Sequence, residues 1–312
     1  MPDILVIGSL NADLVVKSAR FPQPGETISG EDLQIIPGGK GANQAVAAAK
    51  QGASVVMVGR VGNDSFAPFL VDNLKKNNID TSHVLETDSA TGTAIIVVDS
   101  SGQNSIVLSA GANGKVTPQD VDSAPDAKIL LLQFEIPMET VLHAAKKYKS
   151  KNTTVILNPA PAKEISDELL SHVDILIPNE SELSLLSKQQ VTDVKSAESA
   201  AKELLKYGIQ TSIVTLGKNG ALIVTGNQVT QVKAYQVAVV DTTAAGDSFI
   251  GGFASKLLES ANLLADLQEQ ALALQNAVQY ANACGALATT KFGAQPSIPT
   301  KEEVEKFISN QT

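Results

Sequence analysis

The residues of this sequence best suited to chemistry lie between positions 241 and 254, where a run of small residues leads into a helical pattern. After Gly246 the apolar residues recur on one helical face, at positions 249, 250, 253, 254, 257 and 258. Ala244, Ala245 and Gly246 therefore stand where a loop enters a helix, and their small side chains leave backbone N–H groups open to a ligand. Such N–H groups, aided by the helix dipole, stabilise negative charge.

Asp247 follows directly, in the first turn of this predicted helix. An aspartate at this position can simply cap the helix, which is the structural alternative. A carboxylate beside anion-binding N–H groups also suits a general base, which removes a hydroxyl proton as charge moves onto a phosphoryl group. The segment therefore favours phosphoryl transfer.

A second glycine-rich segment, 37–45, leads into another predicted helix. It lacks the GxxxxGK[ST] spacing of a P-loop, and the GxGxxG pattern is also absent after the first predicted strand. Lys40 and Asn43, with Asn11 and Asp13 after that strand, are polar groups suited to a ligand with many hydroxyls. Singly, Asn11 or Asp13 can equally be a turn residue.

The composition is that of a folded protein with an acidic surface. Of the 312 residues, 43% are hydrophobic and 18% are charged, which is enough for a substantial core and excludes a disordered chain. The 24 Lys and Arg against 33 Asp and Glu give a formal net charge of −9, which argues against nucleic acid and anionic membranes as partners. No apolar run approaches the roughly 20 residues of a membrane span.

The opening residues 2–8 lack the basic leader of a secretory peptide and instead predict a first strand. Cys284 is the only cysteine, so no internal disulfide can form and a cytoplasmic location is expected. The three histidines are far apart and lack zinc-ligand spacing.

Short β-branched runs alternate with amphipathic stretches along most of the chain. This alternation predicts a doubly wound α/β fold, with a mostly parallel sheet covered by helices on both faces. The predicted strands are 4–7, 54–58, 129–132, 154–157, 175–177 and 212–216. The predicted helices are 42–50, 66–77, 139–149, 196–207, 248–258 and 268–288.

Two segments, 14–36 and 92–108, break this rhythm with alternating apolar and polar residues around turn signals at 22–25 and 100–102. We expect them to form a small antiparallel flap over the sheet edge, because an isolated hairpin is only marginally stable. Such a flap commonly acts as a lid over a site, and decorative edge strands are the alternative.

Segments 38–43 and 241–254 together resemble the two signature motifs of the ribokinase-like sugar kinases, the PfkB carbohydrate kinase family. Nearly the whole chain shares the resemblance, which implies one α/β domain over 1–312 with a lid from 14–36 and 92–108. It implies ATP-dependent phosphorylation of the 5-hydroxyl of D-ribose, giving ribose 5-phosphate. Further matching segments are 8–13, 21–27, 59–64, 179–182, 214–217 and 293–297.

The resemblance also implies roles for individual residues. Asp247 becomes the base that takes the hydroxyl proton, and the backbone N–H groups of Ala244, Ala245, Gly246 and Asp247 become the anion hole. Glu135, which follows a predicted strand where α/β sheets place ligand groups, joins the sugar site, although a solvated loop charge is the alternative. The positions expected to hold the sugar are Asn11, Asp13, Gly39, Lys40, Gly41, Asn43, Glu135 and Asp247.

On the nucleotide side, Asn179 and Glu182 match the family's Asn-x-x-Glu pattern, which implies a role in placing Mg²⁺ and phosphate. An acidic residue acting partly through water suits Mg²⁺, which prefers oxygen ligands. Without the resemblance, the same pattern would be taken as an ordinary helix start with an asparagine cap. The expected nucleotide-binding positions are Asn179, Glu182, Thr215, Gly217, Gly220, Gly246 and Asn282.

The resemblance further implies a monovalent-cation site, usually for K⁺, beside the anion hole. Oxygen-only ligation suits such a cation, and Lys291 would offer only its carbonyl, with its ammonium turned away. Asp241 as a turn residue is the alternative. The matching positions are Asp241, Thr243, Ala288, Lys291, Gly293 and Ser297.

Several alternatives stay open at this point. The substrate can instead be 2-deoxyribose, a ketohexose such as fructose, or a nucleoside such as adenosine, and a non-catalytic sugar-binding protein on the same fold is a further possibility. An NAD-dependent oxidoreductase is disfavoured because the glycine fingerprint is absent. The apolar alternation of the flap predicts a homodimer. Segment 261–278 is longer than is typical of the family and should alter the surface near the adenine pocket.

Overall fold

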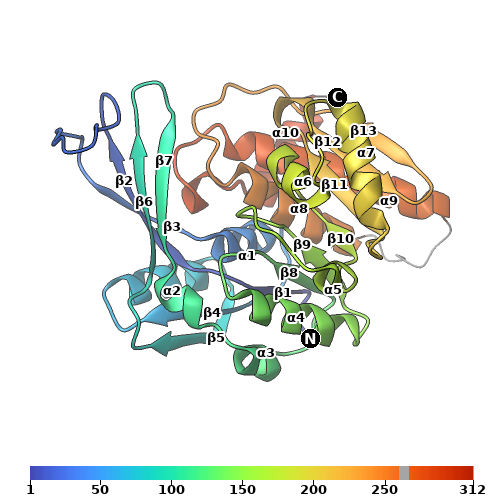
Figure 1. Ribbon diagram of the computed structural model, residues 1–312, viewed down its shortest axis with the longest axis horizontal. Helices are drawn as coiled ribbons and strands as arrows, with labels where there is room; N and C mark the ends of the chain where they lie inside the picture. Colours follow the sequence, from blue (N-terminus) through green and yellow to red (C-terminus); the bar gives the residue numbers. More distant parts are fainter. Residues whose placement is uncertain (260–266, 312) are drawn as a thin grey trace.

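The computed structural model describes residues 1–259 and 267–311, which fold around a mostly parallel nine-stranded sheet (Figure 1). The strand order is β13-β12-β11-β10-β9-β8-β1-β4-β5, and only the pairings of β12 are antiparallel. The strands are β1 (Ile4–Ile7), β4 (Val55–Gly62), β5 (Asp80–Thr87), β8 (Ile129–Leu132), β9 (Thr154–Leu157), β10 (Ile175–Leu176), β11 (Thr211–Thr215), β12 (Ala221–Thr225) and β13 (Val229–Val232).

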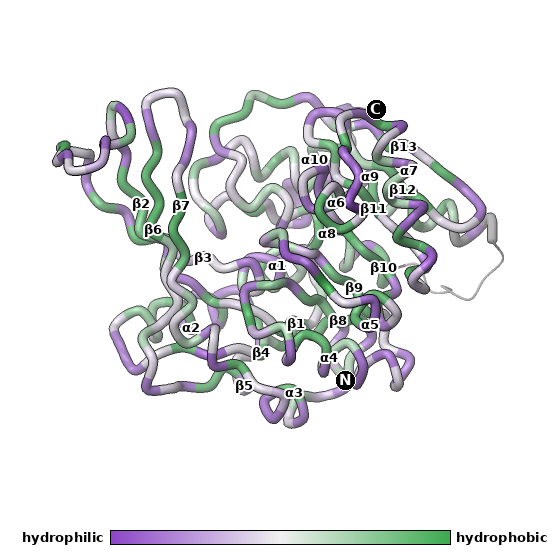
Figure 2. Tube along the Cα trace, in the orientation of Figure 1, coloured by the Kyte–Doolittle hydropathy of each residue, from purple (hydrophilic) through white to green (hydrophobic). Residues whose placement is uncertain are grey.

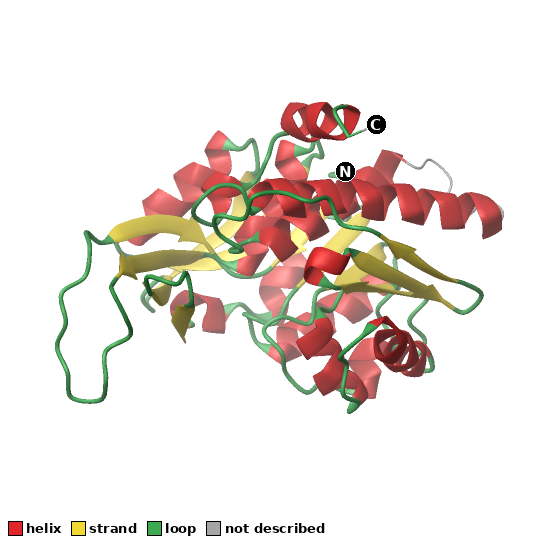
Figure 3. Cartoon of the chain, turned by 90° about the horizontal axis from the view of Figure 1, so that it is seen from above, coloured by secondary structure: helices red, strands yellow, loops and turns green. Residues whose placement is uncertain are grey.

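Helices cover both faces of this sheet, as Figure 3 shows from above. Successive residues of a strand point to opposite faces, so Ile4 and Val6 enter one hydrophobic core while Leu5 and Ile7 enter the other. The first core is covered by α1 (Lys40–Lys50), α2 (Phe66–Lys76), α8 (Ala245–Glu259) and α9 (Leu267–Ala288). The second is covered by α3 (Pro118–Ser123), α4 (Met138–Lys149), α5 (Asp167–Leu170), α6 (Glu180–Ser187) and α7 (Val194–Leu205). The last helix, α10 (Lys301–Ser309), packs on α9.

This architecture confirms the predicted doubly wound α/β class. The predicted strands 4–7, 129–132 and 154–157 have the predicted bounds, and the strand predicted at 54–58 extends to Gly62 as β4. The sequence patterns did not indicate β5, which reads Asp-Thr-Ser-His-Val-Leu-Glu-Thr and lies at the sheet edge. An edge strand buries little, so it carries no continuous apolar run.

A second, four-stranded sheet forms the flap, in the order β3-β2-β6-β7. The expectation of a wholly antiparallel flap is wrong, because β2 and β6 pair in parallel. The reason is topological: β2 continues from β1 and β6 continues from β5, and both leave the parallel sheet in the same direction. The strands are β2 (Asn11–Lys17), β3 (Gln34–Gly38), β6 (Gly92–Val98) and β7 (Asn104–Ser109).

The turn predicted at 22–25 lies inside a longer irregular connection between β2 and β3, whereas β6 and β7 form the predicted hairpin. Of the segment 261–278, the part up to residue 266 lies outside the described residues, and the rest belongs to α9. None of the helices in the described part of the chain combines the length and the apolar character that a membrane span requires.

Candidate active site

The candidate site lies where the central parallel strands end. β1, β8 and β9 are neighbours in the sheet, so the residues after Ile7, Leu132 and Leu157 lie at one edge. This edge is where α/β proteins place ligand groups. The N-termini of α1 and α8 meet there, because these helices pack closely: a Cβ atom on Gly251 would lie only 2.4 Å from the Cβ of Ala47.

Asp247 stands in the first turn of α8 and is 7% exposed. Each of its carboxylate oxygens accepts a hydrogen bond from α1: Asn43 Nδ2 donates to Oδ2 at 2.9 Å and Gln44 Nε2 donates to Oδ1 at 3.0 Å. Each carboxylate oxygen keeps further lone pairs, so the group can still accept a proton. The close approach of α1 and α8 therefore sets the orientation of this carboxylate.

The loop before Asp247 has the small-residue geometry that the sequence predicted. Ala244 has a positive φ of 58°, and the N–H of Ala245 donates to the Thr242 carbonyl at 3.3 Å. Within the described part of the chain, the backbone N–H groups of Ala244, Gly246 and Asp247 have no hydrogen-bond partner. Three of the four expected anion-hole groups are thus open, and the fourth makes a long turn bond.

Glu135 is held beside the first turn of α1. Its Oε2 accepts hydrogen bonds from Ser9 Oγ at 2.5 Å, from the Lys40 N–H at 3.2 Å and from Asn11 Nδ2 at 3.3 Å. Asn113 in turn donates to Asn11 Oδ1 at 2.7 Å and is fully buried. These contacts hold Asn11 and Glu135 in fixed orientations before any ligand arrives.

Asp13 and Asn43 complete this polar cluster. Burial, together with the charges of Glu135 and Asp247, raises the pKa of Asp13 to about 7. Asn43 is 5% exposed, and its Oδ1 is buried without a hydrogen-bond partner in the described structure. A buried acceptor without a partner costs free energy, so this atom is suited to a ligand hydroxyl.

Gly39 and Gly41 let the chain cross closely over the connection between β1 and β2. Gly39 has a φ of 89°, which favours glycine, and a Cβ on Gly41 would lie 2.5 Å from the Ser9 nitrogen. Burial lowers the pKa of Lys40, but the charges of Asp247 and Glu135 outweigh it and the pKa is raised overall. Lys40 therefore stays a cation among carboxylates.

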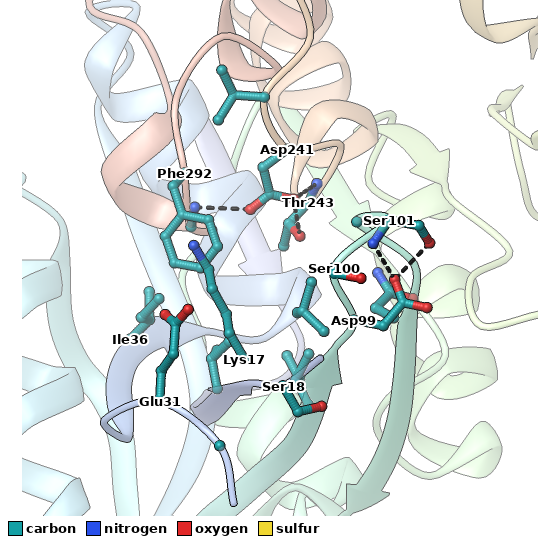
Figure 4. A pocket seen from close by; sticks show the side chains of 18 of the residues that line it. Lys17, Ser18, Glu31, Ile36, Asp99, Ser100, Ser101, Asp241, Thr243 and Phe292 are labelled. Atoms are coloured by element: carbon teal, nitrogen blue, oxygen red, sulfur yellow. Dashed lines mark hydrogen bonds between the residues drawn. The ribbon is translucent and has the colours of Figure 1, made fainter. Parts of the chain in front are cut away.

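Two cavities meet beside these groups, sharing Val239 and Thr242 as lining residues. One has a volume of about 770 Å³, lies under the flap and includes Asp13. In Figure 4 the Lys17 ammonium of this cavity faces the ring of Phe292, 4.3 Å from its centroid. The other has a volume of about 650 Å³ and includes Lys40 and Asp247.

Every residue expected to bind nucleotide lines the 650 Å³ cavity. Asn179 and Glu182 form a reciprocal cap of α6, with N–H to side-chain distances of 2.9 and 2.8 Å. The cap uses only one carboxylate oxygen of Glu182, and burial raises the pKa of this group. Glu182 can therefore cap α6 and bind a ligand at the same time. Asn282 Nδ2 donates to the Val232 and Lys233 carbonyls at 3.2 and 3.1 Å.

The residues expected around a monovalent cation come from two segments, 241–243 and 288–297, and three of them, Asp241, Thr243 and Gly293, line the 770 Å³ cavity. Asp241 accepts hydrogen bonds from Thr243, through its N–H at 2.9 Å and its hydroxyl at 2.6 Å, and from the Gly293 N–H at 2.9 Å (Figure 4). The Lys291 ammonium forms an ion pair with Glu303 at 2.7 Å. Ala288 and Ser297 are fully buried, and the Ser297 hydroxyl donates to the Ala294 carbonyl at 2.8 Å.

Comparison with known proteins identifies the family. Residues 1–301 match the pfkB family carbohydrate kinases. The chain belongs to this family.

Three relatives of this sugar kinase cover nearly its full length. A ribokinase of Staphylococcus aureus is 42% identical over 309 residues, which are 97% of this chain and 98% of that protein. A deoxyribokinase of Salmonella typhi is 38% identical over 313 residues, covering 98% of this chain and 99% of that one. The structure of an Arabidopsis thaliana ribokinase complexed with ribose and ATP superposes with a TM-score of 0.88 at 33% identity, covering 98% of both chains.

The structure of this pfkB family kinase also brings in residues that the sequence reasoning did not single out. Ser9 and Asn113 hold Glu135 and Asn11, and Gln44 holds Asp247. Gln44 lies inside the glycine-rich segment 37–45 and Ser9 inside the matching segment 8–13, so proximity to these segments was an available signal. Asn113 follows the flap in a segment whose sequence gave no comparable indication.

Proposed function

We propose that this sugar kinase transfers the γ-phosphoryl group of ATP to the 5-hydroxyl of D-ribose, giving ribose 5-phosphate. The observation that carries the proposal is the position of Asp247, an oriented carboxylate beside three open backbone N–H groups, in the wall of the 650 Å³ cavity. The ribokinase relatives, one of them solved with ribose and ATP, support the two substrates.

In this mechanism the sugar lies under the flap, and its reacting hydroxyl faces Asp247. Asn43 Oδ1 accepts a sugar hydroxyl, while Asn11, Asp13 and Glu135 hold the remaining hydroxyls. Asp247 takes the proton as the hydroxyl oxygen attacks phosphorus, and the N–H groups of residues 244–247 stabilise the charge on the transferring group. Since phosphoryl transfer asks mainly for alignment and charge stabilisation, these groups suffice for the protein's part.

ATP occupies the 650 Å³ cavity, with its phosphates toward the N-terminus of α8 and its base toward Asn282. Lys40 has no carboxylate within ion-pair distance among the described residues, so its ammonium is available to a phosphate. Glu182 keeps one oxygen outside its cap and, with Asn179, suits a Mg²⁺ ion held partly through water. When bound, Mg²⁺ neutralises phosphate charge.

We further propose that K⁺ binds between segments 241–243 and 288–297, at Asp241, Thr243, Ala288, Lys291, Gly293 and Ser297. The donor set is oxygen only, which suits such a cation. A bound cation would hold the Asp241–Thr243 turn, which leads into the anion-hole loop. The measurement is the rate of ADP release in K⁺ and Na⁺ buffers of equal ionic strength.

A homodimer through the flap is also proposed. One apolar residue from each flap strand forms a row across its outer face, since Leu14 pairs with Ile35 and Ile95, and Ile95 pairs with Val107. Ile35, Ile95 and Val107 are 45%, 51% and 63% exposed, and Figure 2 shows green, hydrophobic stretches along β2, β6 and β7. An uncovered apolar sheet face of this kind is typical of an interface. With one cysteine, the dimer is expected in the cytoplasm.

The second candidate substrate is 2-deoxyribose, which the deoxyribokinase relative favours. A coupled assay of ADP release, run with ribose, 2-deoxyribose, fructose and adenosine, separates the candidates. We expect the highest kcat/KM with ribose. A higher value with another compound would replace ribose as the substrate, and the absence of sugar-dependent ADP release would favour a sugar-binding protein without activity.

A further inference from the structure

A chain of buried amide side chains runs from the ends of two central strands to Asp247. Gln133 follows β8, Asn158 follows β9, and Gln44 lies on α1 between them and the carboxylate. Gln44 and Gln133 are 0% exposed and Asn158 is 7% exposed. Gln44 therefore cannot reach a substrate, yet its Nε2 lies 3.0 Å from Asp247 Oδ1.

The chemistry of Asp247 determines how each amide in this chain is oriented. An ionised carboxylate only accepts, so Gln44 must present its NH₂ group to Asp247 and its oxygen to the other side. That oxygen accepts from Gln133 Nε2 at 2.6 Å. The Gln44 NH₂ group also donates to Asn158 Oδ1 at 3.3 Å, and Asn158 Nδ2 donates to the Ile177 carbonyl at 3.0 Å.

These contacts leave Gln44 no alternative orientation. A flipped amide would place its oxygen against Asp247 Oδ1 and Asn158 Oδ1, and its NH₂ group against the NH₂ group of Gln133. The cost of this arrangement appears at Gln133, whose Oε1 is buried without a hydrogen-bond partner in the described structure. A fully buried polar chain with one unsatisfied end does not favour stability. A role in orienting the carboxylate explains why such a chain stands here.

We propose that Gln44, held by Gln133 and Asn158, is a positioning residue for the base: it holds the Asp247 carboxylate in the orientation that accepts the sugar proton. The inference rests on the proposed function of Asp247. Asp13 on β2, Lys40 on α1 and Glu182 on α6 interact electrostatically with Asp247, and Glu135 acts on Asp13 and Lys40. None of them hydrogen-bonds Asp247 in the described structure, which leaves its orientation to Asn43 and Gln44.

The first test is the substitution Gln44→Met, which removes the donor and keeps a similar volume. Because Gln44 does not touch substrate, we expect kcat to fall roughly tenfold to a hundredfold, the value of one hydrogen bond to a charged group, while KM for sugar stays within about threefold. In an Asp247→Asn background the same change should have almost no further effect on kcat. Wild-type kcat in Gln44→Met, or an equal fall in both backgrounds, would overturn the proposal.

The second test is Gln44→Glu, which presents an oxygen to Asp247 in place of the donor. Two carboxyl groups at this distance share a proton, so the acid limb of the kcat–pH profile should move upward by about one unit or more. An unmoved limb contradicts the proposal. If both Gln44 variants fail to fold, Gln133→Met decides: it frees the Gln44 amide to turn, and kcat should fall with no further fall in the Asp247→Asn background.

Gln51 supplies the matched control. It is a buried amide at the end of α1, 5% exposed, which donates to the Pro299 carbonyl and accepts from the Tyr280 hydroxyl, both at 2.8 Å. Gln51→Met and Gln51→Glu should destabilise the fold without changing kcat or its pH profile. The two proposals remain distinguishable: near-normal turnover in Asp247→Asn refutes the base itself, whereas an inactive Asp247→Asn with normal Gln44 variants refutes only the positioning role.

Discussion

At the scale of single residues, the side chains of the site use some of their hydrogen-bonding groups for partners within the protein and leave others open to a ligand. One oxygen of Glu135 accepts three hydrogen bonds, and Glu182 uses one oxygen in its cap. Asn43 donates to Asp247 while its own oxygen has no partner in the described structure. Preorganised groups of this kind lose little free energy in reordering when a ligand binds.

The first prediction concerns Asp247. Asp247→Asn should lower kcat by about 10²–10⁴, because an amide cannot take the hydroxyl proton. Sugar binding, measured by calorimetry without ATP, should change little, since the neighbouring Asn11, Asp13 and Glu135 remain. Turnover close to that of the wild type would remove Asp247 from the mechanism.

The second prediction follows from Asp13, whose pKa is raised to about 7 mainly by burial. Because this lies above the unfolded value, the native state holds the proton more tightly, and the resulting stability is fully present below about pH 4 and lost as the pH rises through 7. Between pH 5 and pH 8 the free energy of unfolding of the wild type should therefore fall relative to that of Asp13→Asn, by a few kcal/mol at most. Urea unfolding of both proteins at the two pH values measures this, and parallel pH dependences would contradict it.

At the scale of elements, close helix and strand approaches decide which groups can meet. The first turn of α1 crosses the connection between β1 and β2 so closely that the N–H of Ala42 donates to the Ser9 carbonyl at 2.9 Å. The same approach brings the Lys40 N–H to Glu135. The close packing of α1 on α8 then brings Asn43 and Gln44 to Asp247. Positions without a side chain are what permit these approaches.

The substitution Gly41→Ala tests whether the close approach of α1 to the connection between β1 and β2 matters. An added Cβ would lie 2.5 Å from the Ser9 nitrogen and 2.7 Å from the Gly8 carbonyl carbon, so the helix start must shift. We expect a loss of about 1–3 kcal/mol in the free energy of unfolding and a raised KM for sugar. Gly226→Ala is the control, because no atom lies within 4 Å of its added Cβ. If Gly41→Ala and Gly226→Ala had the same free energy of unfolding and the same KM for sugar, the close approach of α1 to the connection between β1 and β2 would not matter.

At the scale of the whole molecule, the flap has two different faces. Its inner face, which includes Asp13, Val15 and Ile96, lines the 770 Å³ cavity. Its outer face carries the apolar row of Leu14, Ile35, Ile95 and Val107. In the proposed dimer, a partner covering the outer face would also stiffen the sheet whose inner face lines this cavity.

The fourth prediction is therefore a dimer that Ile95→Glu with Val107→Glu converts to a monomer, because charges on this face cannot be buried without partners. Light scattering after size exclusion gives the mass. Tyr207→Glu, which changes an exposed aromatic residue after α7, should leave the dimer intact. A wild-type protein with monomeric mass would contradict the proposed interface.

Local sequence determined much of this protein. The strands at 4–7, 129–132 and 154–157 were predictable because a strand buried on both faces must be a continuous apolar run. The open N–H groups at residues 244–247 were predictable because the first N–H groups of a helix have no acceptor within the helix, and small side chains leave them uncovered. The polar edge strand β5 and the parallel pairing of β2 with β6 were not, since they depend on neighbours from elsewhere in the chain.

The tertiary structure alone decided which side chains meet. Asn43 and Asp247 are 204 positions apart, and Gln44 and Gln133 are 89 apart, so no spacing in the sequence could indicate their hydrogen bonds. Those contacts exist because α1 packs against α8 over the ends of β8 and β9. Sequence periodicity records which face of an element is buried, whereas the partner across that face depends on the packing of the whole chain.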